Sequence, residues 1–156
     1  MKRPTYVTDK ALKQFIKSAL EEDIQSGDHS TLSTIPSDLM QSAKLLVKED
    51  CILAGVELAE IIFKTFDKNL KIEVFIKDGE NAKVGDIAFI VTGKAQSILS
   101  TERLVLNCMQ RMSGIATLTH DWDSRLIGTK TKLLDTRKTT PNFRICEKWA
   151  VSIGGG

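Results

Sequence analysis

Residues 100–126 read STERLVLNCMQRMSGIATLTHDWDSRL, which is the pattern of one long helix. Four apolar side chains, at Val105, Met109, Met112 and Ala116, recur every three or four residues along one side of it. Such a stripe predicts that this side of the helix packs into a hydrophobic core. The helix separates two parts of the chain whose patterns differ, and each part predicts a different type of fold.

The residues after the helix have the pattern of a parallel α/β structure. Residues 131–135 (TKLLD) predict a short strand, residues 136–141 (TRKTTP) a polar loop, and residues 143–153 a helix that ends at Gly154. Helix, strand, polar loop and helix in that order open a parallel α/β fold. A complete barrel of this kind needs roughly 200 or more residues. We therefore expect a second domain that is truncated at residue 156.

The residues before the helix mix helices and strands. Amphipathic helices are predicted over 9–20 and 55–66, and strands over 43–48, 71–77 and 87–91. Glycine-containing turns separate the later strands. This order predicts an α+β domain in roughly the first hundred residues.

Composition excludes several classes of protein. The chain has 156 residues, 42% of them hydrophobic, and a formal net charge of +2. The balance argues against both a disordered acidic chain and a strongly basic nucleic-acid binder. We expect neither a membrane-spanning segment nor a signal peptide, because no long apolar run occurs. Three cysteines without a C-x-x-C pair indicate reduced thiols and a cytoplasmic location.

The densest chemical signal is the run from Leu134 to Pro141. Arg137 and Lys138 directly follow the end of the predicted strand, where parallel α/β folds carry their binding groups. Arginine can hold a carboxylate through two parallel N–H bonds, and lysine adds a point charge. The loop therefore suits a small, highly anionic ligand. A solvated basic loop before a helix is the alternative that spacing alone leaves open.

Other polar residues have ordinary structural explanations. Arg103, beside Glu102, has the spacing of a surface ion pair, and Cys108 lies on the apolar face of the long helix, where packing is expected. His29 and His120 have no partners at the spacings of a metal site or a catalytic triad. From spacing alone, a structural role is the expectation for each of these residues.

Residues 78–95 resemble the hairpin of biotinyl and lipoyl carrier domains, in which a lysine at a tight turn carries the cofactor. That comparison would place the modification on Lys94. Carrier domains are small and all-β, however, and predicted helices lie on both sides of this segment. Lys94 also lacks the residues that flank a carrier lysine, so a structural turn is the favoured interpretation.

Five motifs occur in one order along the chain: residues 22–31 (EDIQSGDHST), 102–107 (ERLVLN), 110–117 (QRMSGIAT), 135–141 (DTRKTTP) and 148–156 (KWAVSIGGG). Together they resemble the motifs of the quinolinate phosphoribosyltransferase family, also called nicotinate-nucleotide pyrophosphorylase (carboxylating). Each motif alone is moderately specific, the five in this order are highly specific, and the resemblance extends over essentially the whole chain. The resemblance implies an N-terminal α/β sandwich domain over residues 1–111. The start of an incomplete, TIM-like α/β barrel over residues 112–156 would follow it.

The resemblance also implies an activity. The ring nitrogen of quinolinate attacks C1 of the ribose of 5-phosphoribosyl 1-pyrophosphate and displaces pyrophosphate. The 2-carboxylate leaves as carbon dioxide, which gives nicotinate mononucleotide for NAD synthesis. Such a pentosyltransferase works in the cytoplasm on small molecules, binds neither nucleic acid nor membrane, and uses Mg²⁺ with the pyrophosphate.

The family's substrate-binding residues fall on Thr136, Arg137 and Lys138. Arg103 matches an arginine that the family donates to the neighbouring subunit of a homodimer, so the resemblance overrides the surface ion pair predicted for it. The family's catalytic groups and metal ligands fall beyond Gly156, so the segment alone is expected to be inactive. Residues 142–143 (Asn-Phe) stand where many members have Gly-Leu.

Two alternative functions stay open at this point. One is a paralogous phosphoribosyltransferase-like protein, either nicotinate-using or molybdenum-associated, with the same two-domain layout. The other is a non-catalytic interaction fragment whose long helix pairs with a partner. Turnover of quinolinate with release of carbon dioxide separates the first alternative from the main hypothesis.

Overall fold

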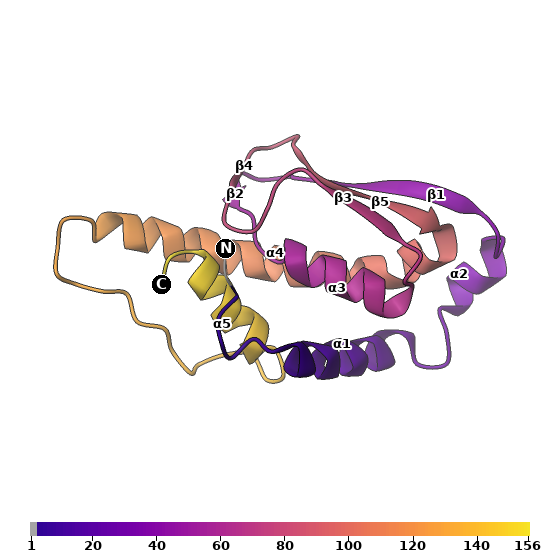
Figure 1. The fold of residues 1–156 in the computed structure, drawn as a ribbon, viewed down its shortest axis with the longest axis horizontal. Helices are drawn as coiled ribbons and strands as arrows, with labels where there is room; N and C mark the ends of the chain where they lie inside the picture. The colour runs from indigo at the N-terminus through magenta and orange to yellow at the C-terminus, as the bar shows by residue number, and fades with distance from the viewer. Residues whose placement is uncertain (1–2) are drawn as a thin grey trace.

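A computed structural model describes residues 3–156. One face of a small antiparallel sheet is covered by helices, and a further helix lies below that helical layer (Figure 1). The helices are α1 (Asp9–Ile24), α2 (His29–Thr34), α3 (Val56–Phe66), α4 (Ala95–Arg125) and α5 (Arg144–Ile153). The strands are β1 (Met40–Leu46), β2 (Cys51–Ile52), β3 (Lys71–Val74), β4 (Asn81–Ala82) and β5 (Ile87–Lys94).

The main sheet has β5 at its centre. β1 and β3 pair with β5 on either side, both antiparallel, and β2 pairs with β4 in a separate two-stranded sheet. β5 alternates between the core and partial exposure, and Ala88, Phe89 and Val91 are buried. The α+β character predicted for the first hundred residues is therefore confirmed.

α4 is the long helix that the sequence predicts, and it begins five residues earlier than expected, at Ala95. Val105, Met109, Met112 and Ala116 are all buried, as the stripe predicts. On one side the helix packs against α3 and the sheet, and on another it packs against α5. It runs without a break through residue 111, where the boundary between the predicted domains falls, and that boundary stays a prediction.

The start of α3 shows how a distant side chain can cap a helix. Gly55 precedes the helix and has no side chain to offer. Asp78 comes from the turn after β3 and accepts from Val56 N (2.8 Å) and Glu57 N (3.0 Å). Burial raises the pKa of Asp78, although these backbone donors favour its charged form. This cap therefore connects the turn after β3 with the start of α3.

α5 approaches α4 closely because Gly154 ends it. A Cβ at this position would lie 2.5 Å from the Ala116 carbonyl oxygen, so any side chain would push the two helices apart. Cys146, Trp149, Ala150 and Ile153 form the buried face of α5.

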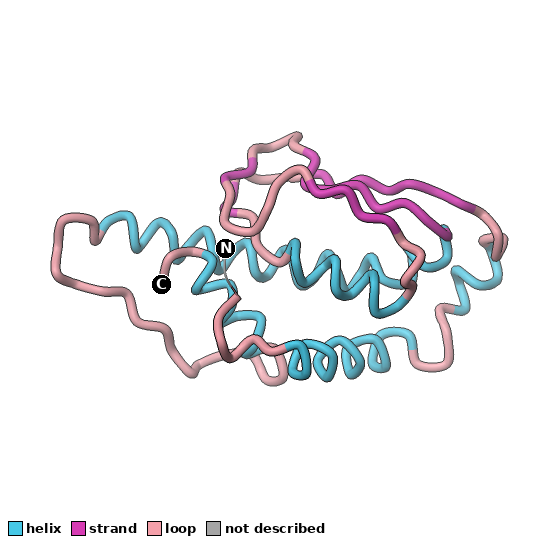
Figure 2. The backbone as a smooth tube through the Cα atoms, in the orientation of Figure 1, coloured by secondary structure: helices cyan, strands magenta, loops and turns pink. Residues whose placement is uncertain are grey.

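Residues 126–143 leave the end of α4 and return beneath the helical layer to α5 (Figure 2). The strand predicted over residues 131–135 is not formed, and this prediction was wrong for the chain as described. A strand is held by hydrogen bonds to a neighbour, and within residues 3–156 no other strand pairs with this segment. Leu134 is consequently 85% exposed.

Two further findings concern the helices. The short helix α2 was missed, because its six residues carry no apolar period. None of the helices in residues 3–156 combines the length and apolarity that crossing a bilayer requires.

Candidate functional site

The loop that carries Thr136, Arg137 and Lys138 is fastened at its start. Asp135 forms an ion pair with Lys148 of α5 through Oδ2, and its Oδ1 accepts from Thr136 N at 2.6 Å. The Thr136 hydroxyl in turn accepts from Lys138 N at 3.2 Å. The backbone before and after Arg137 is thus held by a chain of side-chain contacts that begins at α5.

The same loop is fastened at its end by Glu147, also on α5. Thr140 donates its N–H to Glu147 Oε2 (3.0 Å) and its hydroxyl to Oε1 (2.8 Å). Arg111 of α4 donates to Glu147 Oε1 through Nε (3.0 Å) and Nη2 (2.8 Å). Arg144 adds a bond from Nε to the Thr139 hydroxyl at 2.8 Å.

Glu147 is the most deeply buried charged group at this site, with 5% of its surface exposed. Burial is the largest single influence and opposes its ionisation. The hydrogen bonds from Arg111 and Thr140 together outweigh burial and leave the pKa of Glu147 below its ordinary value. The group is therefore a buried carboxylate that is charged at neutral pH and fully hydrogen-bonded.

Arg137 and Lys138 contrast with these fastened residues. Both are exposed, and within residues 3–156 neither side chain makes a hydrogen bond or an ion pair. Two adjacent cations without carboxylate partners are available to an anionic ligand. The combination of a fastened backbone and unpaired charged tips is the strongest chemical feature of the site.

Arg103 lies elsewhere on the surface, toward the start of α4. Its side chain is 69% exposed, and Nη1 donates to Asp23 Oδ1 of α1 at 2.6 Å. The ion pair expected with Glu102 is not formed, because adjacent residues on a helix point away from each other. Arg103 pairs with Asp23 of α1 instead. An exposed pair of this kind contributes little to stability.

A cleft of about 600 Å³ connects Arg103 with the end of the loop. It lies between α1, α4 and the segment before α5. Arg103, Arg111 and Thr140 contribute its polar wall, and Phe15 and Phe143 part of its apolar wall, with their ring centroids 5.6 Å apart. Thr136, Arg137 and Lys138 do not line this cleft. The structure thus brings Arg103 and Thr140 to one cleft and leaves the other three predicted residues outside it.

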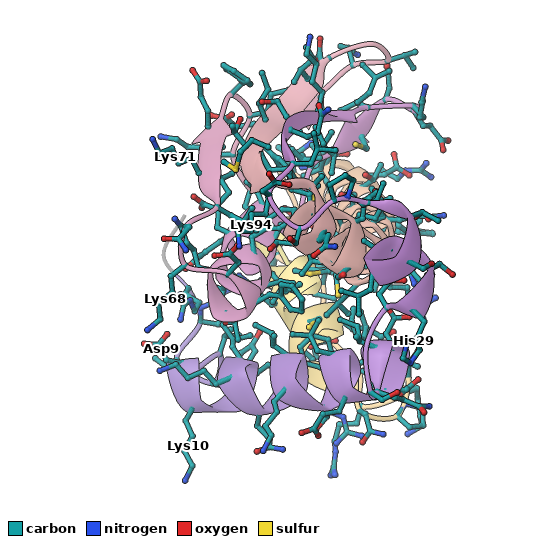
Figure 3. All side chains as sticks on the ribbon, turned by 90° about the vertical axis from the view of Figure 1, so that its right-hand side faces the viewer. Asp9, Lys10, His29, Lys68, Lys71 and Lys94 are labelled. Carbon is teal, nitrogen blue, oxygen red and sulfur yellow. The ribbon has the colours of Figure 1, made fainter. Side chains whose placement is uncertain are left out.

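The cysteines and histidines of residues 3–156 form no second candidate site. Cys108 reaches the cleft wall, but it is buried, and burial raises the pKa of its thiol to about 12. It is therefore a protonated packing residue at neutral pH, as its place on the apolar stripe predicts. Ser26 Oγ lies 3.0 Å from Nε2 of His29, which sits at the outer edge of the molecule (Figure 3).

The carrier-lysine interpretation is not supported by the fold. Lys94 is the last residue of β5 and immediately precedes α4 (Figure 3), so it does not occupy the tip of a hairpin. The surrounding structure is α+β rather than all-β. No group of three His, Cys, Asp or Glu side chains within residues 3–156 is arranged to hold a metal ion.

Sequence reasoning missed Arg111 and Glu147. A signal for Glu147 does exist: it lies between Cys146 and Ala150 on the face of α5 that the apolar spacing marks as buried. A carboxylate in such a place requires a cation or several donors. Nothing in the spacing identifies Arg111 as that cation, because the two residues are far apart in the sequence.

Comparison with known proteins gives consistent matches along the chain. A family model described as "Quinolinate phosphoribosyl transferase, N-terminal domain" matches residues 28–113, and the corresponding C-terminal domain model matches residues 115–156. A tobacco protein named quinolinate phosphoribosyltransferase [decarboxylating] 2b, mitochondrial, is 46% identical over 98% of this chain and 42% of its own length. A Bacillus subtilis protein named probable nicotinate-nucleotide pyrophosphorylase [carboxylating] is 38% identical over 93% of this chain and 50% of its own.

Solved structures give the same result. NadC from Streptococcus pyogenes superposes with a TM-score of 0.90 at 36% identity, covering 96% of this chain and 53% of that one. The nicotinate-nucleotide pyrophosphorylase from Francisella tularensis gives 0.89 at 34% identity, covering 100% and 56%. The chain spans about half the length of the proteins that it matches.

Proposed function

The chain belongs to the quinolinate phosphoribosyltransferase family, and from this premise we propose the activity of the full-length protein. It transfers the phosphoribosyl group of 5-phosphoribosyl 1-pyrophosphate to the ring nitrogen of quinolinate and releases pyrophosphate. The 2-carboxylate then leaves as carbon dioxide, a proton takes its place on the ring, and nicotinate mononucleotide results. The names of the relatives support this activity over the two alternatives.

The observation that carries the proposal is the pair of unpaired cations on a fastened loop. Quinolinate has two adjacent carboxylates, and Arg137 can hold one through two parallel N–H bonds while Lys138 supplies a second charge. Thr136 lies beside them and adds a hydroxyl. Arg103 and Arg111 already have carboxylate partners within the chain, whereas Arg137 and Lys138 have none within residues 3–156, so the charges of these two loop residues are available to a ligand.

We also propose the assembly and the wider fold. Arg103 is exposed and held by one carboxylate, which is compatible with a role in the pocket of a partner subunit in a homodimer. Residues 1–111 form the N-terminal sandwich domain, and residues 112–156 begin a TIM-like barrel. The segment 131–135, which is not a strand in residues 3–156, would become the first barrel strand only when a neighbouring strand of the full-length protein pairs with it. The cytoplasm remains the predicted location, although the tobacco relative is named as mitochondrial.

Mg²⁺ would accompany the pyrophosphate group of the second substrate and neutralise part of its charge. The residues of this chain do not form a cluster that fits it within the described range, so no step is assigned to the ion here. The role of residues 135–140 is confined to binding and orienting the anionic pyridine substrate.

The activity is tested with the full-length enzyme and quinolinate that carries labelled carbon at its 2-carboxylate. Release of labelled carbon dioxide should require 5-phosphoribosyl 1-pyrophosphate. Nicotinate, offered instead of quinolinate, should not be consumed. Consumption of nicotinate without any turnover of quinolinate would instead assign the protein to a paralogous activity.

Substitution of the loop cations tests the proposed site. Arg137→Ala should lower kcat/KM for quinolinate by roughly 30-fold to several thousand-fold, because losing one charge-assisted contact from a buried anionic complex costs about 2–5 kcal/mol. Lys138→Ala should have a comparable effect. The matched control is Lys132→Ala, an exposed cation on the same segment, which should change kcat/KM by no more than about twofold. Near-normal turnover in both loop variants would remove this loop from the active site.

A further inference from the structure

Two sets of side-chain contacts hold the loop of residues 135–140 and are called its fastenings. Both come from consecutive residues of α5. Lys148 holds Asp135 at the start of the loop, and Glu147 holds Thr140 at its end. We propose that Glu147 and Lys148 are positioning residues, which set the loop so that Arg137 and Lys138 are presented to the dianionic substrate. This inference rests on the proposed function of the loop.

The fastening through Glu147 is the stronger of the two. Both of its carboxylate oxygens are engaged, one by Thr140 N and the other by the Thr140 hydroxyl and the Arg111 guanidinium. The side chain is nearly inaccessible to water, so its hydrogen bonds face little competition from solvent. Arg111 also donates to the Thr140 hydroxyl at 3.1 Å, and this closes a three-residue network.

The fastening through Lys148 extends further along the loop. Asp135 uses its second oxygen to hold Thr136 N, and the Thr136 hydroxyl accepts from Lys138 N. The contact with Lys148 is therefore relayed through two side chains to the backbone on either side of Arg137. The Lys148 and Asp135 side chains are about a quarter exposed, so this fastening should be weaker than that of Glu147.

The helix that provides both fastenings is itself firmly anchored. Cys146 and Trp149, the residues on either side of Glu147 and Lys148, are buried in the core, and Gly154 brings the end of α5 against α4. A loop with two ends fixed to such a helix has fewer conformations to lose when a ligand binds. The loop is preorganised without any contact to the side chains of Arg137 and Lys138.

Preorganisation has a kinetic signature that differs from simple stabilisation. If breaking a fastening lowers the fraction of molecules with a competent loop, apparent affinity falls by that fraction, and saturating substrate restores the loop. KM for quinolinate then rises while kcat is retained. A merely structural role would reduce the amount of folded enzyme, and so lower apparent kcat with KM unchanged.

The test compares Glu147→Gln and Lys148→Met with the wild-type full-length enzyme. Glu147→Gln is isosteric but places an amide donor against existing donors, and it should raise KM for quinolinate by about tenfold. Lys148→Met should raise it by about threefold, and Lys148→Arg should restore it. KM for 5-phosphoribosyl 1-pyrophosphate and kcat should stay within about twofold of wild type in all three.

The matched control is Arg125→Ala, which breaks the exposed ion pair with Asp121 in the last turn of α4 and removes no contact of Glu147, Lys148 or residues 135–140. It should leave every kinetic constant unchanged. Hydrogen exchange provides a second measurement, in which the amides of residues 136–140 should exchange faster in both fastening variants than in the control.

The Lys148 side chain is more exposed than that of Glu147, so Lys148→Met disturbs the core less. This variant keeps the inference testable should Glu147→Gln fail to fold. An unchanged KM in folded Lys148→Met, with unchanged exchange in the loop, would overturn the inference while quinolinate turnover by the wild type upholds the proposed function. Absence of quinolinate turnover in the wild-type enzyme would overturn both.

Discussion

The middle of α4 and the loop after it differ in how deeply their apolar side chains are buried. Met112 is fully buried, whereas Ile127 and Leu134 are 82% and 85% exposed. A helix satisfies its own backbone hydrogen bonds and needs only a surface to pack on, which α3, α5 and the sheet supply. An extended segment needs a neighbouring strand, and residues 131–135 have none within residues 3–156.

The two regions also differ in the state of their cations. On α4, Arg103 and Arg111 each have a carboxylate partner. On the loop, Arg137 and Lys138 have none within the described residues. The charges free for a ligand therefore lie where packing is sparse, and a separate helix supplies the rigidity that the loop lacks.

The sharpest way to test the difference between the two regions is to combine Arg103 and Arg137 variants. In the proposed homodimer of the full-length enzyme, Arg103→Ala and Arg137→Ala should each abolish activity. In a mixed dimer, one pocket carries both substitutions and the other carries neither. Random exchange of subunits makes half of the dimers mixed, so about a quarter of all sites should recover activity.

Recovery is measured after exchange of differently tagged subunits has been demonstrated, with each parent mixed with itself as the control. A mixture that remains as inactive as the parents would mean that Arg103 acts within its own chain or has no role in catalysis.

The contrast in packing predicts a large difference in stability within the 156-residue chain. Met112→Ala should lower the free energy of unfolding by about 2–5 kcal/mol, because it leaves a cavity in the core. Leu134→Ala should change it by less than about 0.5 kcal/mol, since nothing packs on that side chain. Denaturant unfolding of the two variants measures both values.

The same pair of variants examines the proposed barrel. In the full-length enzyme, a partner strand beside residues 131–135 would bury Leu134, and its replacement by alanine should then cost about 2–5 kcal/mol as well. An equally small effect in both contexts would contradict the proposal that this segment is a barrel strand.

Features that depend on residues close together in the sequence were predictable, and features that depend on contacts between distant segments were not. The helix containing Met112 was predictable because its apolar period is local to the sequence, and its packing needs only a matching surface. The strand at 131–135 has an equally clear local pattern, yet it depends on a partner that the pattern does not contain. α2 has six residues and no period, so its cap by Asp28 was the only available signal.

The site divides in the same way. Arg137 and Lys138 could be proposed from the sequence because they directly follow a predicted strand, although that strand is not formed within residues 3–156. The network of Arg111, Thr140 and Glu147 could not, because it joins three segments that meet only when α5 packs on α4. The only signal in the sequence was the place of one carboxylate, Glu147, among the apolar residues of α5.

The smallest expected effect concerns acid, and it tests whether the fastened end of the loop depends on a charged Glu147. The pKa of Glu147 is lower in the folded protein than its ordinary value of 4.5, because the donors Arg111 and Thr140 outweigh burial. A lowered carboxyl pKa contributes stability that is fully present above the ordinary value and is lost as the pH falls through the folded value. The difference in thermal midpoint between wild type and Glu147→Gln should therefore be constant from pH 6 to pH 8, a range above that value, and should narrow below pH 4.5.

Arg125→Ala, whose ion pair is exposed, is the control, and its thermal midpoint should differ only slightly from that of the wild type at every pH. A difference that stays constant into acid would mean that the amide and the carboxylate hold Thr140 equally well, and that the charge of Glu147 has no part in fixing the loop.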